Sequence, residues 1–323
     1  RQTLPVLANL KVVAEGSMLS LTGTDLEVEL VAREDGVEID REGSATIPAR
    51  KLADIWRSLP EGARVSVEVE GDRAIVRSGR SRFSLATLPV SDFPTVESGP
   101  GDIELKLKQP DLKRLLDQVS FAMAQQDVRY FLNGMLLEIT PQYARSVATD
   151  GHRLAMCTLE QGVAGAERYQ AIVPRKGVIE LGRLLDDGDD EAVLNLGSNH
   201  IKVSQGPFTL TTKLVDGKFP DYEKVIPKDL GRTIEGDRDS LKQAFLRASI
   251  LSNEKYRSVR LIVEDEQLTI QANNPDQEEA VETVPVGYSG DRIEIGFNVS
   301  YLQDVLNALD SDQVQLSVSD ANS

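Results

Sequence analysis

The stretch VATDGHRLAMC (147–157) contains His152, one of the two histidines of the chain, together with Asp150 and Arg153. An aspartate close to a histidine can serve acid and base chemistry, because a carboxylate orients the imidazole and stabilises its charged form. Asp and Gly also supply the backbone geometry of tight turns. Whether the stretch recurs elsewhere in the chain, and in what form, separates these two interpretations.

The chain contains an internal repeat of about 125 residues. Segments that alternate apolar and polar residues break at three positions 125 and 124 residues apart, Asp25, Asp150 and Asn274. A second set of segments, spaced by 126 and 124 residues, begins at Ile47, Val173 and Phe297. Helix-like segments from Asp111 and Ser240 and two Phe-Pro elements recur at a similar offset. Chance similarity between hairpins does not produce so constant a spacing.

The repeat favours a turn over a catalytic dyad. Asp150 has a counterpart at Asp25, whereas His152 aligns near Glu27 and Asp276 and belongs to the middle copy alone. The sequence shows no local nucleophile motif, metal triad or phosphate-binding glycine loop. A binding role for His152 stays open, and a hydrolase that uses Asp150 and His152 remains the catalytic alternative. The other histidine, His200, is expected in an exposed turn.

The patterns predict an α+β fold with antiparallel sheets. Leu112, Leu115, Leu116 and Val119 follow helical spacing with one buried face, and segments such as VSVEVEG (65–71) alternate with a period of two. We expect three domains: 1–102, without the helix that precedes its first strand; 103–227; and 228–323, without its closing strands. The apolar segment LPVLANLKVV (4–13) is predicted to be a strand, and the chain is expected to lack its true N-terminus.

Charge is distributed unevenly along the acidic chain. The formal net charge of −16 opposes binding to nucleic acid unless the basic residues share one surface. The helical segments do carry cations, namely Arg50, Lys51, Arg57, Arg175, Lys176 and Arg183. These residues are either solvated or face a polyanion through phosphate contacts. The single cysteine, Cys157, allows no internal disulfide and favours a reduced, cytoplasmic compartment.

Several long motifs resemble the bacterial DNA polymerase III β subunit, the sliding-clamp family. They are TDGHRLA, DVRYFLNGM, VPRKGVIEL, KLVDGKFPDY, ILSNEKYRSVRL, ANNPDQEEA and IGFNVSYLQDVLNAL, and the resemblance covers essentially the whole chain. It implies three clamp domains, each with two helices on the inner face and sheets outside. A homodimer would form a six-domain ring that encircles duplex DNA without reading its sequence. It also implies a replication processivity factor without catalysis, metal or cofactor.

The resemblance implies a pocket for partner peptides of the DNA polymerase III alpha subunit, the clamp loader and other clamp-binding proteins. The matching positions are Leu132, Thr149, Gly151, His152, Arg153, Leu154, Pro220, Lys224, Val225, Tyr256, Asn298 and Tyr301. Lys224 and Tyr256 depart from the arginine and phenylalanine common in the family, and lysine loses planar two-point donation. DNA contacts carry over to Arg1, Gln126, Tyr130 and Phe131, with weaker cases for Arg175 and Lys176 and, from charge, Arg50 and Lys51.

Charge also predicts how the ring closes. Arg77, Arg80 and Arg82 lie in one strand region of the first copy, and Asp276, Glu278, Glu279 and Glu282 lie in one of the third. Opposite charges at opposite ends of the chain favour a head-to-tail contact. Ile250 and Leu251 are expected at its apolar centre. A ring-shaped peptide-binding scaffold that does not use DNA remains an alternative function.

Overall fold

The computed structural model describes residues 4–96, 99, 101, 103–228 and 231–319. Contacts within the chain divide it into two compact units. The first comprises Arg1–Leu116, Met123–Val147 and Cys157–Gly217, and the second comprises Asp117–Ala122, Ala148–Met156 and Lys218–Ser323.

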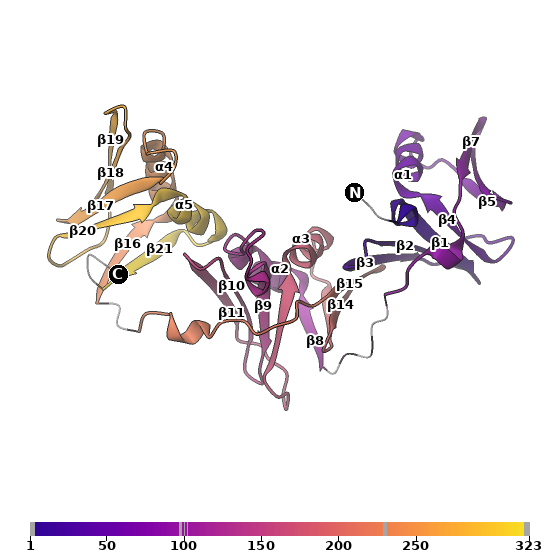
Figure 1. Ribbon diagram of the computed structural model, residues 1–323, viewed down its shortest axis with the longest axis horizontal. Helices are drawn as coiled ribbons and strands as arrows, with labels where there is room; N and C mark the ends of the chain where they lie inside the picture. The colour runs from indigo at the N-terminus through magenta and orange to yellow at the C-terminus, as the bar shows by residue number, and fades with distance from the viewer. Residues whose placement is uncertain (1–3, 97–98, 100, 102, 229–230, 320–323) are drawn as a thin grey trace. The chain divides into compact units, whose positions relative to one another are not determined.

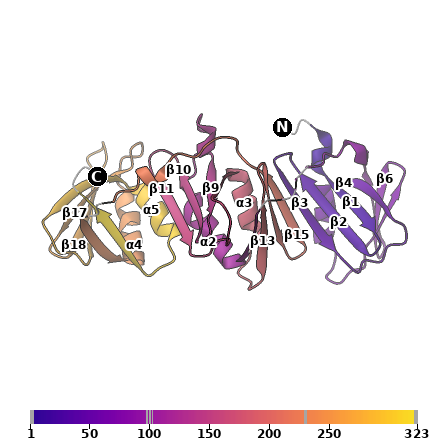
Figure 2. The same cartoon turned by 90° about the horizontal axis from the view of Figure 1, so that it is seen from below.

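An eight-stranded antiparallel sheet runs through the first unit (Figures 1 and 2). Leu30 of one strand lies directly opposite Leu210 of the next, so segments from the first two copies of the repeat share this sheet. In spatial order the strands are β4 (Gly43–Pro48), β1 (Asn9–Glu15), β2 (Met18–Thr24), β3 (Val28–Glu34), β15 (Phe208–Lys213), β14 (His200–Gln205), β13 (Glu191–Leu196) and β8 (Ile103–Lys108).

Two smaller sheets complete the strands of the first two copies. One has the order β5 (Ser66–Glu70), β6 (Arg73–Ser78) and β7 (Ser81–Ala86). The other has the order β11 (Leu154–Leu159), β10 (Ala144–Thr149), β9 (Gly134–Ile139) and β12 (Tyr169–Pro174). Within the described residues, β7 is hydrogen-bonded along one side only, which leaves it a free edge.

The helices α1 (Ala49–Ser58) and α3 (Arg175–Leu184) cover the same face of the eight-stranded sheet. Leu52 and Ile55 of α1 join the apolar cluster that contains Ile47 of β4. On α3, a Cβ added to Gly177 would lie 2.5 Å from Oγ1 of Thr212 on β15. Paired residues of an antiparallel sheet point to one face, and the registers from β4 to β15 place Ile47 and Thr212 on the same one. The third helix of this region, α2 (Gln109–Ser120), buries Leu112, Leu115 and Leu116.

The second unit contains the third copy of the repeat. Its helices α4 (Arg238–Ser249) and α5 (Val299–Ala308) pack against each other (Figure 1). Leu241 and Phe245 of α4 bury their side chains against Leu261 and Ile270 of the sheet. This sheet has the order β19 (Glu279–Pro285), β18 (Gln267–Asn273), β17 (Ser258–Glu264) and β20 (Ile293–Asn298), and β16 (Arg232–Asp237) pairs with β21 (Gln313–Val318).

The predicted α+β class with antiparallel sheets is confirmed, but two local predictions were wrong. The segment 4–13 does not begin as a strand. Proline lacks an N–H and has a fixed φ, so Pro5 starts a short 3-10 helix, η1 (Pro5–Ala8), and the strand begins at Asn9. The remaining 3-10 turns of the described chain are η2 (Val90–Asp92), η3 (Tyr130–Leu132) and η4 (Tyr222–Lys224).

His200 was expected in an exposed turn, but it begins β14 and is half-buried opposite Lys213. Burial lowers the pKa of the imidazole, and the nearby charge of Lys213 lowers it further. Both effects favour the neutral form of the ring, which lies in the sheet.

Candidate functional site

The turn between β10 and β11 is built by hydrogen bonds from Thr149 and Asp150. The Thr149 hydroxyl donates to the carbonyl oxygen of Arg153 (2.6 Å) and accepts from the N–H of Gly151 (3.1 Å). Oδ1 of Asp150 accepts from the N–H groups of His152 (2.9 Å) and Arg153 (3.1 Å). Gly151 has a φ of +90°, which a glycine adopts without steric cost. The aspartate therefore closes the turn, as its residue types predict.

The turn between β2 and β3 repeats this arrangement. Thr24 Oγ1 donates to the carbonyl oxygen of Val28 (2.9 Å), and Asp25 Oδ1 accepts from the N–H groups of Glu27 (3.1 Å) and Val28 (2.9 Å). Leu26 takes the place of Gly151 and also has a positive φ, of +80°. Asp25 and Asp150 thus accept equivalent backbone hydrogen bonds and close equivalent turns. This supports the turn interpretation over a catalytic dyad.

Replacing either aspartate by alanine is expected to loosen its own turn. Asp150→Ala removes an acceptor for two backbone N–H groups, and Asp25→Ala does the same in the first copy. Hydrogen bonds to charged groups contribute about 1.5–3 kcal/mol, so we expect amide exchange at the turn to accelerate by about tenfold or more. Hydrogen exchange of fragments spanning 147–157 and 22–32 measures this. Unchanged exchange in both variants would contradict the assigned role.

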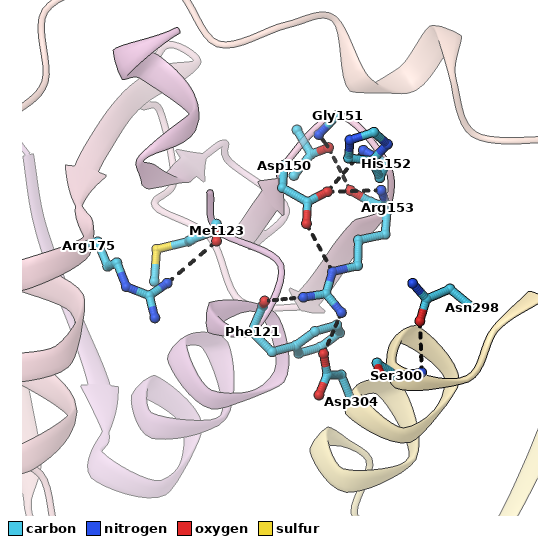
Figure 3. A network of polar contacts seen from close by, with 11 residues as sticks. Phe121, Met123, Asp150, Gly151, His152, Arg153, Arg175, Asn298, Ser300 and Asp304 are labelled. Atoms are coloured by element: carbon cyan, nitrogen blue, oxygen red, sulfur yellow. Dashed lines mark hydrogen bonds and ion pairs between the residues drawn. The ribbon is translucent and has the colours of Figure 1, made fainter. Parts of the chain in front are cut away.

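The guanidinium of Arg153 is held on several sides within the second unit (Figure 3). Its Nε donates to Oδ2 of Asp150 (3.1 Å), Nη1 to Oδ2 of Asp304 (2.5 Å) and Nη2 to the carbonyl oxygen of Phe121 (2.9 Å). Its carbon Cζ lies 4.6 Å from the centre of the Tyr301 ring and 5.3 Å from that of Phe121. Only 19% of the side chain is exposed. The guanidinium of Arg153 is therefore fixed in place, with its donors directed toward acceptors of the protein itself.

Apolar side chains of the predicted pocket are accessible on the same unit. Val225 is 68% exposed, Pro220 is exposed and Leu154 is half-buried, so these residues are not core. Leu132, by contrast, lies in the first unit and is only 2% exposed. Its side chain packs into the local fold, and its predicted role in the pocket stays a prediction.

Lys224 and Tyr256, which depart from the family pattern, are both exposed. Nζ of Lys224 lies 2.8 Å from Oδ2 of Asp221, which raises the pKa of Lys224 and lowers that of Asp221. Nζ of Lys255 lies 5.2 Å from the centre of the Tyr256 ring. Asn298 accepts the N–H of Ser300 (2.9 Å) as the N-cap of α5, and so orients the helix that carries Tyr301.

The predicted DNA-contact residues Gln126, Tyr130 and Phe131 lie in one loop of the first unit. Asn133 braces this loop, because Oδ1 accepts from the N–H of Asp127 (2.9 Å) and Nδ2 donates to its carbonyl oxygen (2.9 Å). Tyr130 is 57% exposed and stands edge-on to Phe131, with ring centres 5.9 Å apart. The loop therefore presents an aromatic and an amide side chain on a fixed base.

The predicted cations differ in how far they are already engaged. Arg50 and Lys51 on α1 are exposed and have no ion pair within the described chain. Lys176 pairs with Asp25, and Nη1 of Arg175 makes a long 3.5 Å contact to the carbonyl oxygen of Met123. Arg1 lies outside the described residues.

Each of the two predicted interface regions includes a strand at the edge of its sheet, β7 in one and β19 in the other. Arg77 of β6 is directly opposite Arg82 of β7, with Arg80 in the turn between them, and Glu68 balances Arg77 at 2.9 Å. On the other unit, β19 is hydrogen-bonded only to β18 within the described residues. There, Glu282 is engaged by Arg247 of α4 at 2.7 Å, whereas Glu279 is exposed.

Comparisons with known proteins agree along the whole chain. Three domain models of the DNA polymerase III beta subunit match this chain. The N-terminal domain model matches residues 1–97, the central domain model 106–221 and the C-terminal domain model 223–323. The beta sliding clamp of Pseudomonas aeruginosa is 57% identical, with 100% of this chain and 88% of that protein covered. The beta sliding clamp of Escherichia coli strain K12 is 54% identical, with 99% and 87% covered. The chain belongs to the beta sliding clamp family.

Solved clamps share its fold. A crystal structure of the DNA polymerase III beta subunit from Pseudomonas aeruginosa matches with a TM-score of 0.96 and 56% identity, over 99% of this chain and 88% of that one. Another clamp from the same organism, solved with griselimycin bound, matches with a TM-score of 0.97 and 56% identity, over 100% and 88%. The protein is a DNA sliding clamp, a non-catalytic replication factor of DNA polymerase III.

No helix in the described part of the chain is long and apolar enough to cross a membrane. No three His, Cys, Asp or Glu side chains among the described residues are grouped so that they could hold a metal ion.

Sequence reasoning missed two residues of the Arg153 network, Asp304 and Phe121. Phe121 contributes a backbone carbonyl group, which no residue type signals. Asp304 lies 151 residues from Arg153 in the chain. A signal for Asp304 did exist in the repeat, because Asp54 and Glu180 occupy the corresponding helical positions.

Proposed function

We propose that this sliding clamp binds partner proteins through a short extended peptide on the surface around Arg153. Leu154, Pro220 and Val225 supply the apolar contacts, and Tyr301 and Arg153 form a stacked wall. The observation that carries the proposal is the combination of accessible apolar side chains with an arginine whose donors are satisfied inside the protein. A surface of this kind favours apolar anchors over a charged ligand.

A surface with few apolar contact residues suits a weak, exchangeable partner contact. Burying one apolar anchor contributes about 1.5–3 kcal/mol, so a peptide with one or two anchors and a few backbone hydrogen bonds binds with a Kd in the micromolar range. We infer that DNA polymerase III alpha subunit and the clamp loader present such peptides in turn. His152 is exposed at the turn and is proposed to flank the bound peptide.

The test uses fluorescein-labelled peptides that tile the DNA polymerase III alpha subunit of the same organism. The tightest-binding peptide is titrated against the intact protein, Leu154→Ala and Pro220→Ala. Loss of an apolar contact is expected to weaken binding by about tenfold or more in each variant. The matched control is Val128→Ala, which changes a side chain that is 94% exposed in the loop before Tyr130. Unchanged affinity in both site variants would overturn the assignment.

We further propose that two copies close head to tail around duplex DNA, with the helices of each copy toward the DNA. The shared orientation of α1 and α3 on one face of the eight-stranded sheet supports this arrangement, since it gathers Arg50, Lys51 and Arg183 on one side of the unit. The domain bounds 1–102, 103–227 and 228–323 stay part of this proposal. The free Cys157, buried in β11, fits a reduced cytoplasmic compartment.

A further inference from the structure

Three helices of the repeat carry an acidic residue at the same position. Asp54 of α1, Glu180 of α3 and Asp304 of α5 are 126 and 124 residues apart, the same offsets that relate the helices. Each lies in the middle of its helix. The recurrence makes the different contacts of these three carboxylates directly comparable.

In the first two helices the carboxylate pairs with an arginine one turn further along. Arg57 lies 3.2 Å from Asp54, and Arg183 lies 2.8 Å from Glu180. Residues three apart on a helix are neighbours on its surface, so these are local pairs. They are exposed and contribute little to folding.

The third helix differs at the partner position. Asn307 stands where the other helices have an arginine, so the local cation is missing. Asp304 pairs instead with Arg153, which comes from the β10–β11 turn. The pair is less exposed than those of α1 and α3, with 19% of the Arg153 side chain and 41% of the Asp304 side chain accessible.

The contact with Asp304 fixes the direction of the Arg153 guanidinium. Tyr301 and Asp304 are three apart on α5 and face the same guanidinium, one through its ring and the other through its carboxylate (Figure 3 shows the Asp304 contact). Because Nε also donates to Asp150 and Nη2 to the carbonyl oxygen of Phe121, the group is held in one orientation over the Tyr301 ring. A neutral residue at 304 would leave Nη1 without its charged acceptor.

We propose that Asp304 is a positioning residue of the peptide site, free to hold Arg153 against Tyr301 because Asn307 replaces the arginine found in the other helices. The inference rests on the proposed peptide-binding function. Asp304 does not itself contact the peptide; it acts through Arg153 and Tyr301. The substitution at 307 makes the site specific to the third copy.

The test measures affinity for the labelled alpha-subunit peptide in four proteins: the unaltered chain, Asp304→Asn, Asn307→Arg and the double variant. Asp304→Asn is expected to weaken binding by about 5–10-fold, since a charge-assisted hydrogen bond at a partly exposed pair is lost. Asn307→Arg offers Asp304 a local partner and is expected to weaken binding by about 2–3-fold, in line with the small energy of such helix pairs. In the Asp304→Asn background, Asn307→Arg is expected to have no effect. The matched control, Glu180→Gln, is expected to bind as the unaltered chain does.

The arginine side-chain signals of a ¹⁵N-labelled sample report the contact without peptide. The Arg153 Nε–H signal is expected to shift in Asp304→Asn and Asn307→Arg, and to stay in place in Glu180→Gln. Full peptide affinity in Asp304→Asn, or an equal loss from Asn307→Arg in both backgrounds, would overturn the positioning role. If the unaltered chain binds none of the peptides, the proposed function fails instead, and the spectra alone decide whether Asp304 holds Arg153.

Discussion

Reversing Arg80 and Arg82 to glutamate is expected to convert the protein from dimers to monomers in light scattering. Arg82 lies on the free edge strand β7, directly opposite Arg77, and Arg80 lies in the adjoining turn. Like charges directly opposite each other destabilise a strand pair, so this edge favours an acidic partner strand. Close charge pairs across interfaces contribute about 1.5–7 kcal/mol, so reversal at both contacts of a two-fold ring is expected to raise the dimer Kd by more than about 100-fold.

We expect the edge strand β19 to supply the complementary surface. Glu278 and Glu279 stand at its start, and Val281 is 55% exposed. Arg247 of α4 pairs with Glu282 of β19, which brings the end of α4 beside this edge, and Ile250 follows that helix with 74% of its surface exposed. An unpaired strand with a nearby apolar side chain is a surface that another chain can extend. Ile250→Asp is therefore also expected to weaken the dimer.

A charge-swap experiment separates this contact from a general effect of charge. Adding Glu278→Arg and Glu279→Arg to the reversed arginines is expected to restore part of the dimer. The matched control reverses Arg41 and Arg64, two exposed arginines of the same region, and is expected to remain dimeric. Dimers that persist after reversal of Arg80 and Arg82 would show that these strands do not form the interface.

Binding to linear duplex DNA with free ends is expected to be weak, independent of sequence and strongly dependent on salt concentration. Each phosphate contact changes the slope of log K for DNA binding against log salt concentration by about 0.9. Replacing Arg50 and Lys51 together by alanine is therefore expected to reduce the slope by about 1.8. Removing Arg175 and Lys176 is expected to change it less, because Lys176 already pairs with Asp25 and Arg175 turns toward Met123. Fluorescence anisotropy of a labelled 20-base-pair duplex across a salt series measures both slopes.

The two double variants serve as controls for each other, since each removes the same formal charge from equivalent helices. A slope that both double variants leave unchanged would contradict phosphate contact by these helices. Equal reductions would show that the ion pair of Lys176 is released on binding.

The repeat made the turns and helices predictable, because local residue types determine them. Asp25 and Asp150 were predicted as turn residues from their spacing, and both close their turns through the same hydrogen bonds. The 3-10 start at Pro5 was missed because an apolar run predicts burial without fixing the backbone conformation. His200 was misplaced because its neighbours Gly197, Ser198 and Asn199 resemble an extended turn, while the strand register continues to His200.

The candidate site was predictable only in part. The family motifs identified Arg153 and Tyr301, but not the contacts that hold them. Asp304 is distant in sequence from Arg153, and Phe121 acts through its backbone. Contacts of this kind depend on how the chain packs. Leu132 of the motif is only 2% exposed, so burial alone does not decide its role, and its place in the pocket stays a prediction.

The central claim is that the protein encircles DNA as a closed ring. The most direct test loads the labelled protein with its clamp loader and ATP onto a nicked circular plasmid, isolates the complex, and then cuts the plasmid once. A ring held by topology remains on the circle and is predicted to leave within minutes of linearisation, by sliding off the ends. Protein that stays on the linear DNA, or that never remains on the circle, would contradict the account.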